Sequence, residues 1–466
     1  MKSIYISFIT LTLSFQLLYG CKKSVQVKPA PDLVITGSVF ASEKTALSAV
    51  SGVYASLRSN NSDMLNGGLS LYTGLAADEL SPSSSSATPM AFYQNQLLPT
   101  TSTVNTTFYT SCYKNIYNIN AILDGLAKSA NISESIKKQF AGEMKTIRAL
   151  RYFYLLNIFG DVPLITSIDY NINAVLPREK KSIVYQKIID DLITAKKDLA
   201  DNYPSTGKAR INKAVATALL SRIYLFTEQW DKAETEATSI IDSEKYTLLP
   251  ATQIASVFLK DSPESIWEIL SPNEFSPPGD GVIFNPSSAA VRPPYFLTPT
   301  LLNAFEPADA RRTNGNWVDS NKVGTTIYYY PKKYRQKNLA ANGTLIENLV
   351  ALRLAEQYLI RAEARAHLNV NLPGAINDLD KIRTRAGLPG SSAQTQDEIL
   401  AAIAKEWRIE FFAESGHRWL NLKRTGKADQ VLSIIKGATW QPTDALFPIP
   451  EKEISYNPNL VQNPGY

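Results

Sequence analysis

The sequence has 466 residues, of which 44% are hydrophobic and 20% charged, and its formal net charge is +5. This composition is typical of a folded protein and excludes disordered and collagen-like chains. The small net charge, without a clustered basic stripe, argues against a nucleic-acid-binding surface, and two cysteines provide neither a disulfide framework nor the spacing of a metal site.

The first residues have the pattern of an export signal. Only Lys2 is charged before Cys21, and residues 4–18 are largely apolar but form a segment too short for a comfortable membrane span. The residues before Cys21 resemble the bacterial lipobox, which predicts a lipoprotein signal peptide over residues 1–20 and a lipid on Cys21. Several acyl chains on one residue would anchor the protein almost permanently. The alternative is an ordinary signal peptide with an incidental cysteine.

After a predicted flexible tether at residues 21–36, apolar residues recur three or four positions apart through much of the chain. This periodicity predicts amphipathic helices. They are expected over residues 43–58, 106–127, 133–158, 183–200, 212–227, 230–243, 349–367, 374–386 and 395–412. The predicted fold class is therefore mainly α, and Cys112 is expected to be a buried free thiol within one of these helices.

Residues 212–243 resemble a tetratricopeptide repeat, in which small residues allow two helices to pack closely. Glu228 departs from the pattern, because it replaces the usual turn glycine. Residues 349–386 predict a second helical hairpin with a longer turn. The leucine, small residue, tyrosine, aromatic residue and alanine of the repeat correspond to Leu220, Ser221, Tyr224, Trp230 and Ala233.

The middle of the chain differs from the helical segments. Residues 262–346 hold ten of the 26 prolines together with Trp317 and the run Tyr328-Tyr329-Tyr330, so we expect irregular structure with a few short strands. A second predicted loop, residues 81–103, is rich in serine and threonine. Long ordered loops on a rigid scaffold are common binding sites.

Aromatic residues in these loops suggest a sugar-binding surface. Sugars present apolar C–H faces that stack on flat rings, while their hydroxyl groups need polar partners. For each aromatic residue, packing in the core is the alternative. Loop position and side-chain chemistry give five candidate ligand-binding residues: Asp78, Phe92, Tyr93, Trp317 and Tyr329.

The best candidates for catalysis or metal binding are Glu406, Glu410, Glu414 and His417. The three glutamates fall on one helix face, and Glu414 and His417 have the Glu-x-x-His spacing of carboxylate-bridged metal sites. Such sites need two of these motifs and two further glutamates, so the pattern favours a structural ion-pair network instead. Its predicted cations are Arg408, Arg418 and Lys423.

Other catalytic arrangements find no support in the sequence. It contains no Gly-x-Ser-x-Gly nucleophile elbow and no phosphate-binding loop. A carboxylate pair that cleaves glycosides stays open, since its members need not be close in sequence. We therefore predict a protein without catalytic activity, cofactor or metal.

Several motifs resemble the SusD/RagB family of outer-membrane lipoproteins. They occur in the family's order and extend over essentially the whole chain after the signal peptide. The motifs are "GEMKTIRALRYFYLLNIFGDVPLI" from Gly142, "ARINKAVATALLSRIYLF" from Ala209, "LRLAEQYLIRAEARAHLN" from Leu352, "AINDLDKIRTRAGLP" from Ala375, "EWRIEFFAESGHRWLNLKRTGKA" from Glu406 and "LFPIPEKEISYNPNLVQNPGY" from Leu446.

This resemblance implies one domain over residues 37–466, in which a tetratricopeptide-like scaffold carries a loop-rich ligand-binding part. Its parts would be residues 37–261, 262–346 and 347–466. The family's members cap a SusC-like TonB-dependent transporter and bind an oligosaccharide or another nutrient outside the cell without catalysis. The implied location is the outer membrane, lipid-anchored and facing the exterior, although Lys22 and Lys23 stand where acidic residues often accompany surface export.

Two other functions stay open at this point. A tetratricopeptide-type scaffold of an envelope complex would bind only the transporter or another protein and would have no nutrient site. A hydrolase would cleave the glycan that it binds. The sequence does not distinguish a sugar from a peptide as the nutrient.

Overall fold

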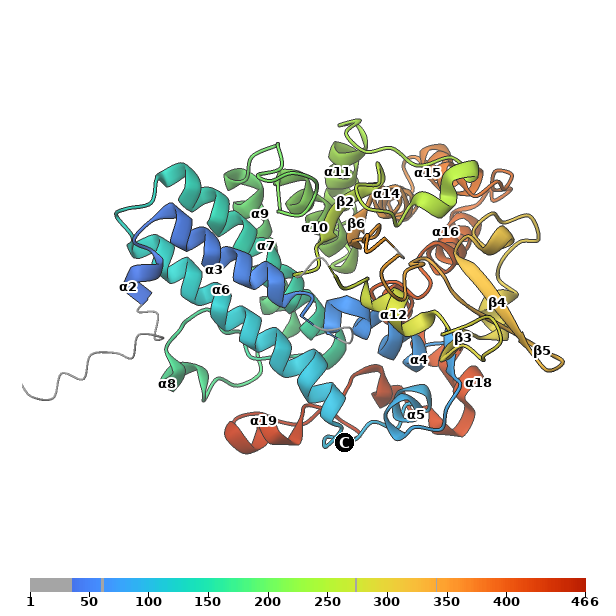
Figure 1. Ribbon diagram of the computed structural model, residues 1–466, viewed down its shortest axis with the longest axis horizontal. Coiled ribbons are helices and arrows are strands. Elements are labelled where there is room, and N and C mark those ends of the chain that lie inside the picture. The colour runs from blue at the N-terminus through green and yellow to red at the C-terminus, as the bar shows by residue number, and fades with distance from the viewer. Residues whose placement is uncertain (1–35, 60–62, 273–274, 341) are drawn as a thin grey trace, which may run out of the picture.

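The structure is a computed structural model that describes residues 36–59, 63–272, 275–340 and 342–466 (Figure 1). The predicted signal peptide, Cys21 and the tether up to residue 35 lie outside the described residues. Within the described ranges, no helix combines the length and the apolar character that crossing a membrane requires.

Helices dominate the structure, which confirms the predicted mainly α class. The α-helices are α2 (Thr36–Val39), α3 (Glu43–Ser56), α4 (Gly74–Ala76), α5 (Ala87–Tyr93), α6 (Ser111–Lys128), α7 (Glu134–Phe159), α8 (Tyr170–Asn173), α9 (Lys181–Asp198), α10 (Lys213–Phe226), α11 (Trp230–Ile241), α12 (Gly279–Phe284), α13 (Pro299–Leu302), α14 (Leu354–Leu368), α15 (Leu372–Arg385), α16 (Gln396–Glu410), α17 (His417–Arg424), α18 (Ala428–Lys436) and α19 (Glu451–Tyr456).

Shorter helical turns and three pairs of antiparallel strands complete the structure. The turns are η1 (Met64–Thr73), η2 (Val104–Thr110), η3 (Ala251–Ser256), η4 (Thr313–Gly315), η5 (Gly437–Thr439) and η6 (Pro442–Ala445). The strands pair as β1 (Leu80–Pro82) with β3 (Tyr295–Leu297), β2 (Ser265–Ile269) with β6 (Leu349–Arg353), and β4 (Val318–Val323) with β5 (Thr326–Pro331).

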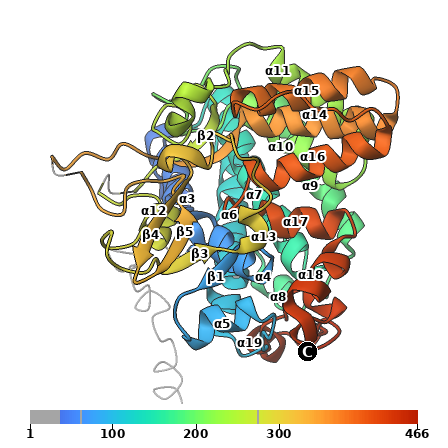
Figure 2. The ribbon, with the colours of Figure 1, turned by 90° about the vertical axis from the view of Figure 1, so that its right-hand side faces the viewer.

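Packed helix pairs form one side of the molecule, where Figure 2 shows α14, α15 and α16 stacked beside α10 and α11. The pairs α10/α11 and α14/α15 are the two predicted tetratricopeptide-like hairpins, and α11 packs directly against α14. At the contact between α10 and α14, the Ser221 hydroxyl lies 2.7 Å from Oε1 of Gln357, and neither residue has exposed surface. A larger residue than Ser221 would overpack this contact. Cys112 is buried and unpaired on α6, as predicted.

The start of the second hairpin differs from the prediction of a helix over residues 349–367. Residues Leu349–Arg353 form strand β6, and α14 begins only at Leu354. The reason is a partner from the middle of the chain: β6 pairs with β2, and the Leu354 amide donates to the Glu264 carbonyl at 2.9 Å. Periodicity within 349–367 carries no information about this distant strand.

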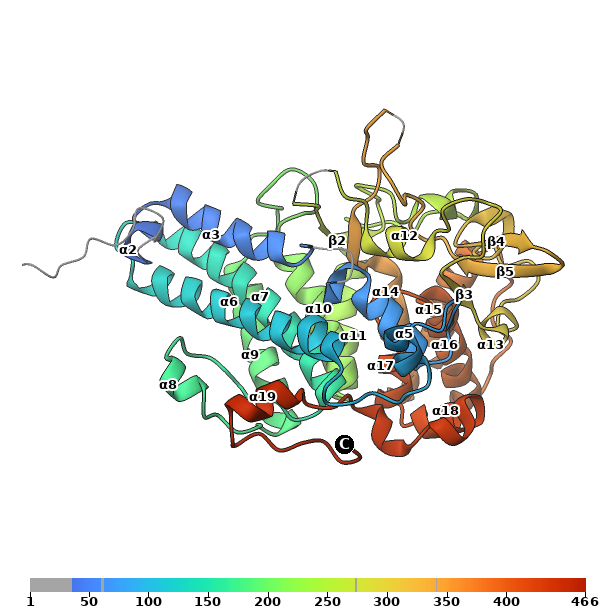
Figure 3. The same cartoon turned by 60° about the horizontal axis from the view of Figure 1, so that its bottom comes forward.

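The loop-rich part contains the strand pairs β1–β3 and β4–β5 and the short helices α12 and α13. Figure 2 shows these strands on the side opposite the stacked helices, and Figure 3 shows the β4–β5 hairpin and α2 at opposite ends of the longest axis. Strands β3 and β5 lie in contact, so the two strand pairs form one continuous surface.

The last twenty residues lie against the helical body (Figure 3). The Phe447 amide donates to the Ile158 carbonyl at the end of α7, at 2.9 Å. The Asn463 side-chain amide donates to the carbonyls of Phe159 and Phe447, at 2.9 and 2.7 Å. Arg178 donates to the Val461 carbonyl at 2.8 Å. The C-terminal segment is therefore integrated into the structure through its backbone.

Two glycine substitutions test how closely the loop-rich part packs. A Cβ atom on Gly281 of α12 would lie 2.3 Å from the Gln336 carbonyl oxygen, whereas one on Gly52 of α3 would meet no atom within 4 Å. We expect Gly281→Ala to lower the free energy of unfolding by about 1–3 kcal/mol, because a backbone atom must move. Gly52→Ala should raise it by about 0.5–1 kcal/mol, since alanine favours helix. Urea denaturation measures both, and equal effects of the two would contradict this packing.

Candidate functional site

A buried network of ion pairs connects the loop-rich part to the C-terminal helices. At its centre, the Glu410 carboxylate accepts hydrogen bonds from Arg311, Arg353 and Arg385. Arg353 also donates to both oxygens of Glu414, at 2.8 and 3.0 Å. None of these five residues is more than 7% exposed. Each charge is therefore compensated by neighbouring charges rather than by water.

Further members extend the network. Glu406 pairs with Arg311, and Glu264 accepts from Arg353 and Arg385, both at 3.2 Å. Burial alone would raise the pKa of Glu410, but Arg385, Arg353 and Arg311 outweigh it and hold that pKa below its usual range. Glu410 is therefore a carboxylate at neutral pH.

Lys333 adds a fourth cation. Its ammonium group donates to Glu414 and to the Glu410 carbonyl, each at 2.7 Å. Burial lowers the pKa of Lys333 to about 8, despite the opposing effect of Glu414. The residue bridges the segment after β5 to the end of α16.

These contacts confirm the ion-pair interpretation of Glu406, Glu410 and Glu414, but the predicted cations were wrong. Arg408 and Arg418 lie elsewhere and bind Asp78. Lys423 donates to the backbone carbonyls of Asn157 and Ala445. The true partners are distant in sequence and could not be inferred from spacing.

His417 packs among aromatic rings. Its ring lies against Phe411 and Trp407, with ring centroids 4.4 and 5.7 Å apart. Burial lowers the pKa of this imidazole well below its ordinary value, and the nearby arginines act in the same direction. Across the described part of the chain, no group of three or more His, Cys, Asp or Glu residues is arranged to hold a metal ion.

Trp317 is a structural residue in this network, which corrects the expectation that it contacts a ligand. Its side chain has no exposed surface, and its indole N–H donates to the Ile254 carbonyl at 2.8 Å. The ring lies over Lys333, Arg353 and Arg385, with the charged groups 5.0 to 5.7 Å from its centroid. Such cation–π contacts stabilise the buried cations.

Asp78 is likewise corrected, because it is only 1% exposed. It accepts two hydrogen bonds from Arg418, at 2.7 and 3.0 Å, and one from Arg408 at 2.5 Å. Burial alone would raise the pKa of Asp78, but Arg418 and Arg408 outweigh it and lower that pKa. This carboxylate joins the segment before β1 to α16 and α17 and is not available to a ligand.

Phe92 is the third correction, since its ring is completely buried. It packs against Tyr72, Phe108 and Phe447, with ring centroids 4.6, 6.3 and 5.5 Å away. The predicted loop at residues 81–103 places this ring inward because residues 87–93 form helix α5 and the C-terminal segment covers it.

The other two candidates are half-buried and lie on different elements. Tyr93 ends α5, and the Lys436 ammonium group lies 4.5 Å from its ring centroid. Tyr329 lies on β5, with the Arg312 guanidinium 5.6 Å from its ring. The expectation that they contact ligand stays a prediction.

A cluster of Arg292, Phe296 and Tyr328 occupies the surface where β3 meets β5; we call it the Arg292 cluster. The two rings meet edge to face with centroids 5.3 Å apart. The Arg292 guanidinium lies 4.9 Å from the Phe296 ring and 4.6 Å from the Tyr328 ring. Arg292 is exposed and both rings are half-buried, so a ligand can reach all three.

The cluster rests on a well-connected backbone. In the hairpin register Asn321 of β4 lies opposite Tyr328, and its amide donates to the carbonyls of Ser288 and Val291 at 2.8 and 2.7 Å. On the other side of Arg292, the Ser83 amide donates to the Pro294 carbonyl at 2.9 Å. Both flanks of the arginine are thus held by hydrogen bonds.

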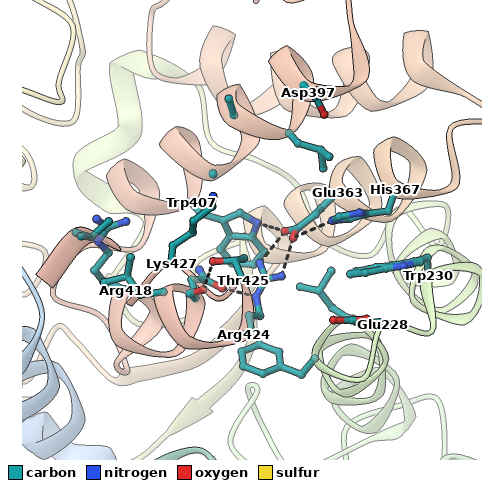
Figure 4. A pocket seen from close by; sticks show the side chains of 18 residues that line it. Glu228, Trp230, Glu363, His367, Asp397, Trp407, Arg418, Arg424, Thr425 and Lys427 are labelled. Atoms are coloured by element: carbon teal, nitrogen blue, oxygen red, sulfur yellow. Dashed lines mark hydrogen bonds and ion pairs between the residues drawn. The ribbon is translucent and has the colours of Figure 1, made fainter. Parts of the chain in front are cut away.

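A separate cavity of about 600 Å³ lies in the helical scaffold (Figure 4). On one wall, the Trp230 and His367 rings stack with centroids 4.0 Å apart. Beside them, Glu363 accepts from the Trp407 indole at 2.9 Å and from Arg424 at 2.6 and 2.7 Å. The cavity therefore lies between helical hairpins whose polar groups bind one another, and not beside the Arg292 cluster.

Two family models match the chain. One, described as "SusD family", matches residues 304–466, and the other, described as "Starch-binding associating with outer membrane", matches residues 42–225. The SusD-like protein P25 of Formosa agariphila is 26% identical, over 96% of this chain and 97% of its own length. The starch-binding protein SusD of Bacteroides thetaiotaomicron is 24% identical, over 70% and 72%.

Solved structures agree with this result. A laminarin-binding SusD-like protein superposes with a TM-score of 0.75 at 25% identity, covering 91% of this chain and 100% of that one. A SusD superfamily protein from Bacteroides vulgatus reaches a TM-score of 0.80 at 22% identity, covering 92% and 100%. The chain belongs to the SusD family.

In this SusD-family chain, the prediction selected Tyr329 of the 328–330 run and did not include Arg292, Phe296 or Tyr328, which the structure brings together. The alternation of side chains along a strand could have separated the two tyrosines. Neighbouring side chains on β5 point to opposite faces, so Tyr328 and Tyr329 cannot share one surface. Which of them faces β3 depends on the pairing of β5 with β4, which the sequence alone did not show.

Glu410→Ala should be strongly destabilising. Removing this carboxylate leaves three buried guanidinium groups short of a partner, and breaking a buried pair costs about 3–5 kcal/mol. Urea denaturation at neutral pH measures the free energy of unfolding. Glu451→Ala, on the exposed start of α19, is the control and should change it by less than about 0.5 kcal/mol. Equal stability of the two variants would contradict the structural role of the network.

The stability of the protein should also depend on pH through Glu79. This side chain is 2% exposed, its Oε2 accepts the Ala413 amide at 3.1 Å, and burial raises its pKa to about 7, with Asp78 acting in the same direction. A raised pKa means that the folded state holds the proton more tightly, so stability falls as pH rises from about 4.5 to about 7.

Glu79→Gln tests this dependence, because glutamine is neutral at every pH. We expect the variant to match the natural protein at pH 5 and to be more stable at pH 8, by on the order of 2 kcal/mol. Urea denaturation at both pH values measures the difference. Glu451→Gln is the control, and its stability relative to the natural protein should not change between pH 5 and pH 8. If Glu79→Gln also shows no change between these pH values, the Glu79 carboxylate is already ionised at pH 5 and the prediction is wrong.

Proposed function

We propose that this protein is a lipid-anchored, non-catalytic binding protein of the outer membrane that captures oligosaccharides and delivers them to a SusC-like TonB-dependent transporter. Relatives described as starch-binding and laminarin-binding support a glycan as the ligand. The family description that mentions the outer membrane supports the location. The anchor in this proposal is a lipid on Cys21, and the binding surface faces the cell exterior.

The Arg292 cluster is the observation that carries the proposal. It places two aromatic rings and a guanidinium group together in the loop-rich part, where a ligand can reach them. Aromatic rings bind the C–H faces of sugars, and a guanidinium group donates hydrogen bonds to their oxygen atoms. Because the flanking backbone is held in place, little conformational entropy is lost when a ligand binds.

The acidic residues support binding over cleavage. Glu406, Glu410 and Glu414 are all buried and paired with cations, so none of them can reach a glycosidic bond. Glycoside hydrolysis needs one carboxylic acid and one carboxylate on either side of that bond. Incubation with soluble starch or laminarin should release no reducing ends, and their release would show a hydrolase.

The scaffold cavity favours one alternative function, a protein-binding scaffold of an envelope complex. Glu228 and Asp397 lie on its exposed rim, and neither carboxylate has a hydrogen bond or ion pair within the described structure. Glu228 also adopts a left-handed backbone conformation, with φ of 57°, at the turn between α10 and α11. Stable co-purification with a transporter together with no binding to any glycan would favour this alternative.

Tyr328→Ala tests the proposed glycan site. We expect the variant to lose about tenfold or more in affinity for the glycans that the protein binds, because truncating a central aromatic residue commonly costs over 1 kcal/mol. Affinity electrophoresis in gels containing soluble starch, laminarin or pectin measures retardation, and the melting temperature should change little because Tyr328 is half-buried.

Tyr456→Ala is the matched control. This tyrosine is 67% exposed on α19, away from the β4–β5 hairpin (Figure 3), and its loss should leave retardation unchanged. Equal weakening by the two substitutions would count against the Arg292 cluster as the binding site. A large fall in the melting temperature of Tyr328→Ala alone would show that Tyr328 has a structural role.

A further inference from the structure

Arg292 has aromatic neighbours but no polar partner. Its guanidinium lies over the rings of Phe296 and Tyr328, at 4.9 and 4.6 Å from their centroids. Within the described ranges of the chain, the side chain forms no hydrogen bond and no ion pair, and the residue is exposed. These ring contacts are cation–π contacts and not hydrogen bonds, so the guanidinium N–H groups remain available to a ligand.

The nearest strands offer this arginine no carboxylate. The β4–β5 hairpin contains a single acidic residue, Asp319. Its carboxylate already binds the Lys332 ammonium group and accepts a hydrogen bond from the Tyr330 hydroxyl at 3.3 Å. By contrast, Arg312, Arg353, Arg361, Arg383 and Arg385 each have an acidic or carbonyl partner within the protein.

The position of Arg292 is fixed by its neighbours in the chain. The carbonyl before it, on Val291, accepts from Asn321 at 2.7 Å, and the carbonyl of Pro293 accepts from the Ser83 hydroxyl. Two consecutive prolines, Pro293 and Pro294, then restrict the backbone before β3. The guanidinium is thus held in place by both its backbone and the two rings before any ligand binds.

We propose that the ligand of the Arg292 cluster is an acidic oligosaccharide, whose carboxylate or sulfate group binds the guanidinium of Arg292 while its sugar ring contacts Phe296 or Tyr328. This inference rests on the proposed glycan-binding function and adds the charge of the ligand. The guanidinium edge presents paired N–H groups that match two oxygen atoms of such an anion. A neutral glycan would leave this charge without a counterpart at the centre of the site.

Isothermal titration calorimetry on the purified protein tests the inference with three kinds of probe. Oligogalacturonate supplies carboxylates, oligosaccharides of a sulfated galactan supply sulfate esters, and maltooligosaccharides and laminari-oligosaccharides are neutral. We expect one acidic probe to bind more tightly than every neutral one. Its affinity should fall between about 50 and about 300 mM NaCl, since salt screens exposed charges. The two acidic probes identify which anion is recognised.

Substitutions then assign the effect to Arg292. Arg292→Gln should weaken binding of the acidic probe at least tenfold, and Arg292→Lys should restore only part of it, because lysine lacks the planar fork. Lys322→Gln is the matched control: it removes the same charge from an exposed residue of β4 that lies opposite Ile327 and outside the cluster. It should leave the affinity nearly unchanged.

The possible results separate the two proposals. Tighter binding of a neutral probe that depends on Tyr328 but not on Arg292 would overturn the acidic ligand and leave the glycan-binding function intact. If Arg292→Gln and Lys322→Gln lose the same affinity for the acidic probe, the preference for acidic probes comes from general electrostatic attraction. That result would also overturn the assignment of Arg292 as the binding residue. No binding of any probe, acidic or neutral, would count against the glycan-binding function itself.

Discussion

The bonds between Glu410 and its three arginines are the constraint on which the rest of the structure depends. Arg311 comes from the loop-rich part, Arg353 from β6 and Arg385 from the second helical hairpin, so one carboxylate joins three segments that are far apart in sequence. Removing charges from water is costly and is offset only when each charge keeps good partners. The segments can therefore be buried only together, in one relative arrangement.

This arrangement explains how irregular loops can present a defined surface. The described residues of 262–346 form only short helices and short strands, so regular secondary structure alone provides little rigidity. Lys333 attaches this part to the end of α16 and Trp317 packs against Arg353 of β6, and the β4–β5 hairpin lies between Trp317 and Lys333 in the chain. The SusD-family scaffold thus acts as a fixed support for the Arg292 cluster.

The sequence predicted most of the helices, because the apolar face of an amphipathic helix is visible within about fifteen residues. It also predicted the ionic role of Glu406, Glu410 and Glu414. It failed for Trp317, Asp78 and Phe92, whose burial depends on distant partners: three cations for Trp317, Arg408 and Arg418 for Asp78, and Phe447 for Phe92. Loop position alone does not separate a ring that faces water from one that covers a charge.

The C-terminal segment has a consequence for how the chain reaches its folded state. Residues 447–466 supply backbone and side-chain partners to Ile158, Phe159 and Arg178, and Phe447 packs against the ring of Phe92. These contacts join residues that are synthesised 283 positions apart for Arg178 and Val461, and 304 positions apart for Phe159 and Asn463. Helix α7 and the aromatic core beside it therefore stay incomplete during synthesis until these last residues have been made.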